Sequence, residues 1–256
     1  MRRYYTRACN FYYGANAKNF IKKKLALPLC GNENIAFDSI EILSRDKKNK
    51  IINIKNIKKL SNLIKKIVLK DLKKIVSRRK KLNKYFSISK PLIMGVLNLT
   101  PDSFSDGGLY VQSNKAFTHV NNMISKGADI IDIGGESTRP GSKDVPHKVE
   151  WKRLEKIITN FKKKFPKTFL SIDTRKSEVM LAAIKNKSDL INDVSGFEYD
   201  ERSIDKIKNY NIWKVLHHMK GTPNTMQVKP SYKNVLLDVY DFFEKKINTD
   251  FKSFKY

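Results

Sequence analysis

From Pro91 onward, short apolar runs alternate with longer stretches in which apolar and polar residues mix. The apolar runs lie at 92–97, 129–133, 168–172, 189–191 and 212–216. Amphipathic stretches follow them at about 113–126, 150–165, 176–187, 201–210 and 231–250. A strand followed by a helix, repeated five times, indicates parallel strands joined by crossover helices. This part of the chain therefore predicts an α/β fold, either an eight-fold barrel or a doubly wound sheet.

Each expected strand runs into a polar or glycine-rich cluster. The clusters are Asn98, Asp132 to Glu136, Asp173-Thr174, Asn192-Asp193 and His217-His218. Parallel α/β folds bind ligands at the carboxyl ends of their strands, and in a barrel all of these ends meet at one mouth. In a doubly wound sheet, only the ends near the point where the strand order reverses would gather. Five polar ends in succession therefore favour the barrel.

Residues 1–90 have a different pattern. Two stretches, Ile35–Phe37 and Ile40–Leu43, could pair as short strands. Apolar residues between Ile57 and Val76 recur at helical spacing with lysines among them, which predicts one basic amphipathic helix over roughly 55–82. A helix lying on a membrane surface would have the same pattern. We favour a helix packed against its own domain.

Positive charge is concentrated in the first part of the chain. Of 52 Lys and Arg and 25 Asp and Glu, residues 1–90 hold 25 and 5. Such an excess raises nucleic acid as a partner, but no RNP-type motif, zinc-finger spacing or helix-turn-helix pattern accompanies it. A general preference for lysine explains it better, and a nucleic-acid partner is not expected. We divide the chain into a basic N-terminal extension at 1–90 and a partial barrel domain at 91–256.

The sequence contains no pattern typical of a membrane span or a secretion signal. No apolar run approaches the roughly 18–20 residues that span a bilayer, and the polar N-terminus lacks the apolar core of a signal peptide. Cys9 and Cys30 could form one bridge at most, which does not make a disulfide scaffold. We expect a cytoplasmic protein with no membrane partner.

Two long motifs lie at the first two strand ends. Residues 94–108 read MGVLNLTPDSFSDGG and residues 127–141 read GADIIDIGGESTRPG. Shorter motifs follow at 171–174 (SIDT), 191–193 (IND) and 218–223 (HMKGTP). Together and in this order, they resemble the signatures of the dihydropteroate synthase family. The resemblance covers residues 91 to about 250 and implies a TIM-type (β/α)8 barrel of the pterin-binding kind.

The resemblance implies a reaction between two small molecules. The family condenses 4-aminobenzoate with (7,8-dihydropterin-6-yl)methyl diphosphate and releases diphosphate and 7,8-dihydropteroate. Its site must stabilise an anionic leaving group and a positive carbon. Mg²⁺ neutralises diphosphate and prefers hard oxygen ligands with several waters retained, and the resemblance makes Asn98 its protein ligand. A homodimer is usual in the family.

The pterin site is carried over residue by residue. A buried carboxylate and a buried amide can match the fixed edge of donors and acceptors on a pterin and reject analogues that lack it. The resemblance gives this edge to Asp173 and Asn192. It places Asp132 near the ring or the cation and lets Met219 pack on the ring face. Asp173 could instead cap the following helix, and Asp193 is the weaker candidate because a cap or a brace for the turn would account for it equally well.

Loops after the first two strands supply the remaining contacts. The resemblance places 4-aminobenzoate, and the sulfonamides that compete with it, at Phe104 and Pro140, and the diphosphate at Thr138. Arg139 would position the anionic end of the substrate, because a guanidinium suits an anion at such a strand end. The residues expected to be catalytic are Asp132, Asp173 and Arg139.

The chain departs from the family pattern in its later strands. Five strand–helix units occupy residues 91–256, whereas an eight-fold barrel takes about 250 residues. The family continues with motifs of the Asp-Pro-Gly-Phe-Gly, Ser-Arg-Lys and Arg-x-His types, and none of them occurs in this sequence. An open sheet leaves two edges unpaired and its inner apolar face exposed. We expect this chain alone to fold poorly, or to be completed by a partner fragment, and to have little synthase activity.

Two other classes of function stay open. The methyltetrahydrofolate-binding barrels of corrinoid methyltransferases share the barrel and the strand-end Asp and Asn, but they lack the long loop motif at 98–107. A non-catalytic remnant with a basic region that binds nucleic acid is the second, and a steep salt dependence of that binding would support it. Tight binding of a pterin diphosphate with magnesium would instead support the enzyme.

Overall fold

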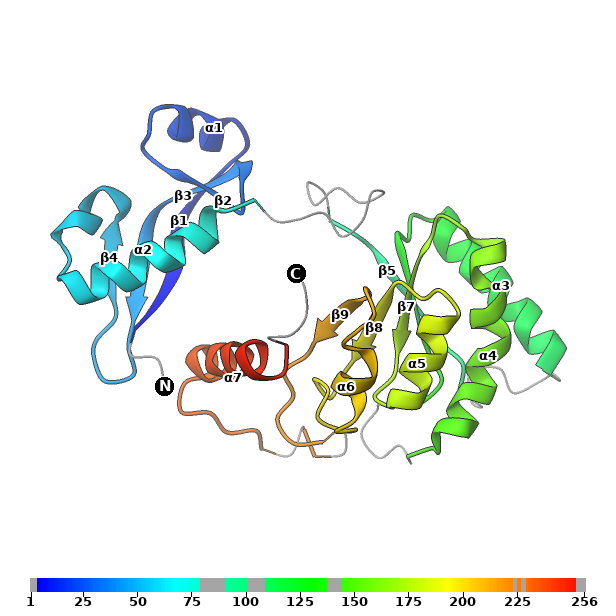
Figure 1. Cartoon of the computed structure of the whole chain (residues 1–256). Coiled ribbons are helices and arrows are strands. Elements are labelled where there is room, and N and C mark those ends of the chain that lie inside the picture. The colour runs from blue at the N-terminus through cyan, green and yellow to red at the C-terminus, as the bar shows by residue number, and fades with distance from the viewer. Residues whose placement is uncertain are drawn as a thin grey trace. The chain divides into compact units, whose positions relative to one another are not determined.

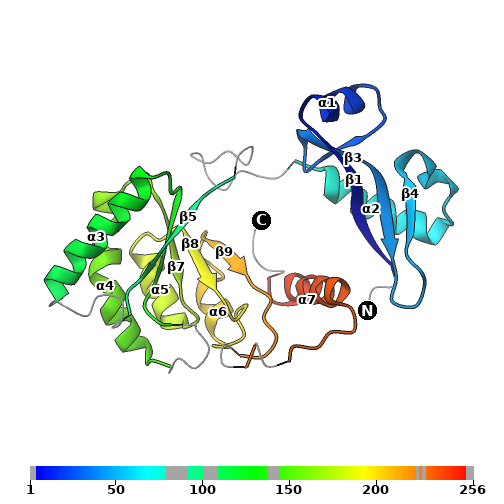
Figure 2. The ribbon, with the colours of Figure 1, turned by 180° about the vertical axis from the view of Figure 1, so that it is seen from behind.

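The computed structural model describes residues 4–78, 91–100, 109–137, 144–222, 225–226 and 229–251. These residues form two compact units (Figures 1 and 2). The first contains residues 4–78 together with 233–241, and the second contains the described residues of 91–232 together with 242–251.

The first unit is built on an antiparallel sheet. Its strands are β1 (Tyr5–Tyr13), β2 (Leu27–Leu29), β3 (Asn32–Leu43) and β4 (Lys50–Asn53), with helix α1 (Gly14–Lys22) between β1 and β2. Strand β3 pairs with the three other strands. The expectation that Ile35–Phe37 and Ile40–Leu43 are two short strands is wrong, because both stretches belong to β3 and pair along its length with β1.

The basic helix of the first unit is shorter than the pattern predicts. A 3-10 helix η1 (Ile54–Lys59) precedes helix α2 (Asn62–Val76). The two are separate because Leu60 and Ser61 are extended, and α2 ends where Ser77 becomes extended. Its apolar side packs on the sheet of its own unit, as favoured above, in a cluster with Phe37 and Ile40. Within the described ranges, every helix is too short or too polar to cross a lipid bilayer.

The first unit also contains the beginning of helix α7 (Val235–Thr249). Leu237 is buried against Tyr5 and Leu43. The guanidinium of Arg45 forms ion pairs with Asp238 at 2.6 Å and with Asp241 at 2.8 Å. Residues 233–241, which the sequence pattern groups with the barrel, therefore belong to the N-terminal unit.

The second unit contains a parallel sheet of five strands and the helices that follow them. The strands are β5 (Met94–Asn98), β6 (Ile130–Gly134), β7 (Phe169–Asp173), β8 (Leu190–Asp193) and β9 (Trp213–Leu216), hydrogen-bonded in this order. The helices are α3 (Leu109–Ser125), α4 (His147–Lys164), α5 (Ser177–Lys185), α6 (Ser203–Ile207) and the later part of α7. The predicted α/β fold with five βα units is confirmed. The sheet is open, so the unit is a partial (β/α)8 barrel.

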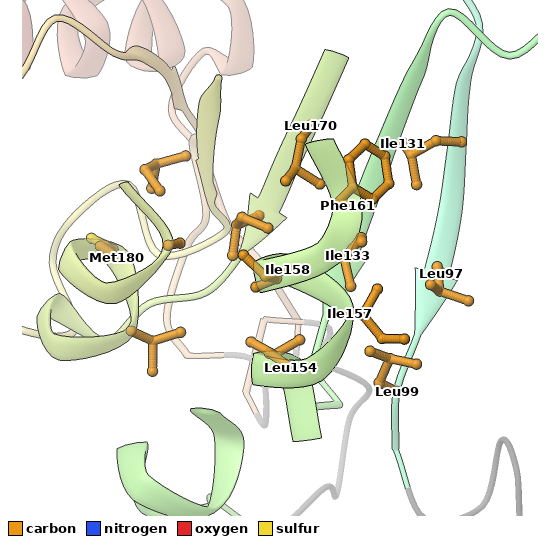
Figure 3. Close-up of a cluster of buried hydrophobic side chains, with 14 of the residues drawn as sticks. Leu97, Leu99, Ile131, Ile133, Leu154, Ile157, Ile158, Phe161, Leu170 and Met180 are labelled. Atoms are coloured by element: carbon orange, nitrogen blue, oxygen red, sulfur yellow. The ribbon is translucent and has the colours of Figure 1, made fainter. Parts of the chain in front are cut away.

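One face of this sheet packs against the helices (Figures 1 and 3). Buried side chains of the strands and helices form one cluster, which includes Leu97, Leu99, Ile131, Ile133, Leu154, Ile157, Ile158, Phe161, Leu170 and Met180. Burying a Leu, Ile or Phe side chain contributes about 1.5–3 kcal/mol. This packing fixes the strands, and because strand residues alternate, it turns the intervening residues to the opposite, inner face.

The inner face is polar at the carboxyl ends of the strands and apolar below them. Toward the amino ends, the edge strands β5 and β9 present exposed apolar side chains: Val96 is 54% exposed, Trp213 42% and Met94 38%. On the central strands, the inner-facing Ile130, Phe169 and Leu190 are buried. The exposed apolar surface therefore lies at the two open edges of the sheet.

Candidate active site

Strand register brings four of the polar strand ends into one row. Asn98 pairs with Gly134, Gly134 with Asp173, and Asp173 with Asn192. A Cβ atom added to Gly134 would lie 3.4 Å from Asp173 Oδ2 and 3.6 Å from Asn98 Oδ1. Gly134 thus leaves open the space that the Asn98 amide and the Asp173 carboxyl share.

A chain of hydrogen bonds on the inner face links residues of β6, β7 and β8 to His217, which follows β9. Ser171 Oγ donates to Asp132 Oδ1, and Asn192 Nδ2 donates to Asp132 Oδ2 at 3.1 Å. The ring Nε2 of His217 lies 2.7 Å from Asn192 Oδ1. The sequence analysis does not select Ser171 or His217 as site residues. Each lies two residues from a residue that faces the inner side, Asp173 and Val215 respectively, so strand alternation predicts that both face the same side. The structure thus adds two residues to the predicted site.

The two inner-facing carboxyls of the site have different surroundings. Burial raises the pKa of Asp132, while the donors Ser171 and Asn192 counteract this effect. Burial and the nearby charge of Asp132 raise the pKa of Asp173 to about 7. Within the described part of the chain, the Asp173 carboxyl accepts no hydrogen bond. One carboxylate is thus held by protein donors, while the other is free to titrate near neutral pH and to meet a ligand.

Asp193 has the bracing role that its position predicts. Its buried carboxylate accepts hydrogen bonds from Ser195 N at 2.8 Å, Ser195 Oγ at 2.7 Å and Phe197 N at 3.1 Å. These bonds fold the turn after β8, in which Gly196 has a φ of 63°. A Cβ atom at Gly196 would lie 2.6 Å from the carbonyl oxygen of His217. The turn therefore packs directly on the backbone of His217, where only glycine fits.

The adjacent histidines have different surroundings. His217 faces the polar row, whereas the ring of His218 packs edge-on against Phe242 at 4.8 Å between centroids. Met219 follows at half-buried exposure, and its packing on a pterin ring stays a prediction. Phe104, Thr138, Arg139 and Pro140 lie outside the described residues.

A buried ionic cluster lies where the loop after β6 begins and ends. Glu136 accepts from both Arg175 and Lys176, the latter at 2.7 Å, and from the backbone N of Val145 at 3.1 Å. Lys176 also donates to Glu150 at 2.9 Å. The carboxylate of Glu136 thus joins the start of this loop to its end and to the residues after β7. A hollow of about 490 Å³ lies beside the cluster, apart from Asp173 and Asn192.

The described residues offer few ligands for a metal. They contain no group of three or more His, Cys, Asp or Glu side chains placed to hold an ion. The amide oxygen of Asn98 lies at the strand end, in the row with Asp173. A single amide oxygen fits an ion such as Mg²⁺, which keeps several waters and binds substrate phosphates.

The fold and the strand-end site define a class of protein that sequence comparison identifies. A family model described as pterin binding enzyme matches residues 94–251. This is more than half of the chain, and the chain belongs to the pterin-binding enzymes. The particular proteins that it resembles are dihydropteroate synthases.

Three relatives show the extent of the similarity. The Haemophilus influenzae dihydropteroate synthase is 39% identical over 166 residues, which cover 65% of this chain and 60% of the relative. The Yersinia pestis enzyme with a sulfonamide drug has a TM-score of 0.60 at 35% identity, covering 66% of this chain and 60% of that one. The Burkholderia cenocepacia enzyme complexed with 7,8-dihydropteroate has a TM-score of 0.56 at 37% identity, covering 66% and 56%. The chain thus spans between 56% and 60% of the length of these relatives.

Proposed function

We propose that the second unit carries the pterin site of a dihydropteroate synthase, which joins 4-aminobenzoate to (7,8-dihydropterin-6-yl)methyl diphosphate and releases diphosphate. The observation that carries this proposal is the juxtaposition of the buried Asp173 carboxyl with the Asn192 amide on neighbouring strands. A carboxylate and an amide side by side complement the row of donors and acceptors on a pterin edge. The small-molecule partners are therefore the pterin diphosphate and 4-aminobenzoate.

The remaining site residues take roles that fit their chemistry. Asp132, whose carboxyl accepts hydrogen bonds from Ser171 and Asn192, stabilises positive charge that develops on the pterin methyl carbon. Arg139 and Thr138 bind the anionic groups, and Phe104 and Pro140 line the 4-aminobenzoate and sulfonamide position, as the resemblance implies. Met219 packs on the ring face.

Magnesium is the cofactor of the proposed reaction. Asn98 would hold it through the amide oxygen, next to the space that Asp173 faces. When bound, the ion neutralises the diphosphate as it leaves. Asp173 stays outside this role because its carboxyl is needed for the pterin edge. A homodimer and a cytoplasmic location complete the proposal.

Pterin binding tests the proposal without requiring turnover. We expect (7,8-dihydropterin-6-yl)methyl diphosphate with Mg²⁺ to bind the full chain in a calorimetric titration at pH 8. Asp173→Asn should bind at least about 100-fold more weakly, because an acceptor becomes a mixed donor and acceptor against a fixed edge. Asp205 is an exposed carboxylate on α6, and the control variant Asp205→Asn should bind the pterin diphosphate as tightly as the parent chain does. Equal affinity for the Asp173 variant and the parent chain would contradict the proposal.

Catalysis should also require closure of the open sheet. Trp213 is exposed on edge strand β9, so a polypeptide that adds strands there would bury it. We expect the C-terminal portion of the Haemophilus influenzae relative, beyond the matched region, to shift the Trp213 fluorescence to shorter wavelength. A Trp151→Phe background isolates this signal, since Trp151 and Trp213 are the two tryptophans of the chain. An unchanged spectrum, together with full synthase turnover by residues 1–256 alone, would contradict the requirement.

A further inference from the structure

The orientation of the Asn192 side-chain amide follows from its two neighbours. Asn192 Nδ2 donates to Asp132 Oδ2 at 3.1 Å, and Ser171 Oγ donates to the other oxygen of the same carboxyl. The amide oxygen must then face His217 Nε2 at 2.7 Å. Because that oxygen can only accept, His217 Nε2 carries the hydrogen and donates it.

We propose that His217 is a positioning residue that determines specificity, because its Nε2–H holds the Asn192 amide in one orientation and so fixes the order of donor and acceptor that the site presents to a pterin. This inference rests on the proposed function. An amide rotated by 180° would offer the reverse order to the same ligand edge. Asp132 holds one end of the amide and His217 the other, and with both in place the rotated form is excluded.

The structure fixes His217 from its backbone as well as from its ring. Gly196 lies against the His217 carbonyl with no room for a Cβ atom. Three hydrogen bonds to the buried Asp193 carboxylate hold the turn that contains Gly196. This support gives the ring a defined position from which to reach Asn192. The arrangement accounts for a buried carboxylate, Asp193, that faces away from the proposed ligand.

Three substitutions of His217 distinguish the effect of its hydrogen-bond donor from the effect of its side-chain size. Glutamine can place an amide N–H near the position of the imidazole Nε2, whereas asparagine reaches only as far as Nδ1. His217→Gln should therefore restore the bond to Asn192, while His217→Asn and His217→Met should not. His119→Met on the exposed side of α3 is a matched control for loss of a histidine.

Affinity for (7,8-dihydropterin-6-yl)methyl diphosphate with Mg²⁺ is the functional measurement. We expect binding about tenfold weaker for His217→Met and His217→Asn, since one hydrogen bond is lost and its acceptor is left unpaired. His217→Gln should stay within about threefold of the parent, and His119→Met should not differ from it. Equal affinity for the Met and Gln variants would overturn the proposal, because size alone would then account for position 217.

Nuclear magnetic resonance of the ligand-free chain keeps this test separate from the proposed function. The Asn192 side-chain NH₂ signals, assigned with Asn192→Asp, should move in His217→Met and return toward the parent positions in His217→Gln. The imidazole nitrogens of His217 should show the Nε2–H tautomer. If the parent chain binds no pterin, the proposed function is wrong. The signals of the ligand-free chain would still show whether His217 orients the Asn192 amide. Unmoved Asn192 signals in His217→Met would overturn the positioning role.

Discussion

Replacing Asp173 by Asn is expected to stabilise the ligand-free protein at pH 8 and to leave its stability unchanged near pH 3. The pKa of Asp173 is about 7 in the folded chain, above its ordinary value of 3.8. Between these values the folded state binds more protons than the unfolded state, so the carboxyl lowers stability progressively as the pH rises from about 4 to 7. The full penalty, at most about 4 kcal/mol, is present above pH 7.

Asparagine mimics the protonated carboxyl and avoids this penalty. The free energy of unfolding of the second unit can be measured in urea by tryptophan fluorescence, because Trp151 and Trp213 both belong to that unit. We expect Asp173→Asn to gain about 1–3 kcal/mol at pH 8, with the gain shrinking at pH 6 and vanishing at pH 3. Asp205→Asn should show no such trend. A loss of stability at every pH would mean that Asp173 is held by contacts rather than left free for a ligand.

The sequence pattern predicts the five parallel strands correctly because the burial of each strand depends mainly on its own residues. Strands covered by helices on one face read as short apolar runs, and each of the five observed strands lies within two residues of its predicted run. Alternation along β7 then places Asp173 on the inner face. The register that aligns Asp173 with Gly134 and Asn192 follows from parallel pairing of strands that end in polar residues.

Features that depend on contacts between distant segments were not predictable in this way. His217 and Asn192 meet only because β8 and β9 are neighbours in a particular register. The extended residues Leu60 and Ser61 interrupt an apolar spacing that continues through them. The membership of residues 233–241 in the first unit depends on ion pairs with Arg45, almost 200 residues earlier. None of these contacts leaves a periodic trace in the sequence.

The buried ionic cluster behind the β6 loop was also missed, since Lys176 looks like an ordinary helix-start lysine. In the structure its ammonium is shared by Glu136 and Glu150, whose side chains are 4% and 0% exposed. Removing one partner of a buried pair costs far more than removing a surface charge, because the remaining charge is left without compensation. Here a single substitution at Lys176 would leave Glu150 without the cation that it contacts, and Glu136 dependent on Arg175.

Lys176→Met is therefore expected to destabilise the second unit by about 3–5 kcal/mol, measured as the free energy of unfolding in urea at pH 7. Lys163→Met, at an exposed lysine of α4, should change it by less than about 0.5 kcal/mol. Adding Glu150→Gln to Lys176→Met should recover part of the loss, because the orphaned charge is removed. If the single variant does not fold, the paired variant and Lys176→Arg still test the idea, since both retain charge balance. A loss no larger than that of Lys163→Met would show that Arg175 alone neutralises the loop base, and that Glu150 is buried in its neutral form.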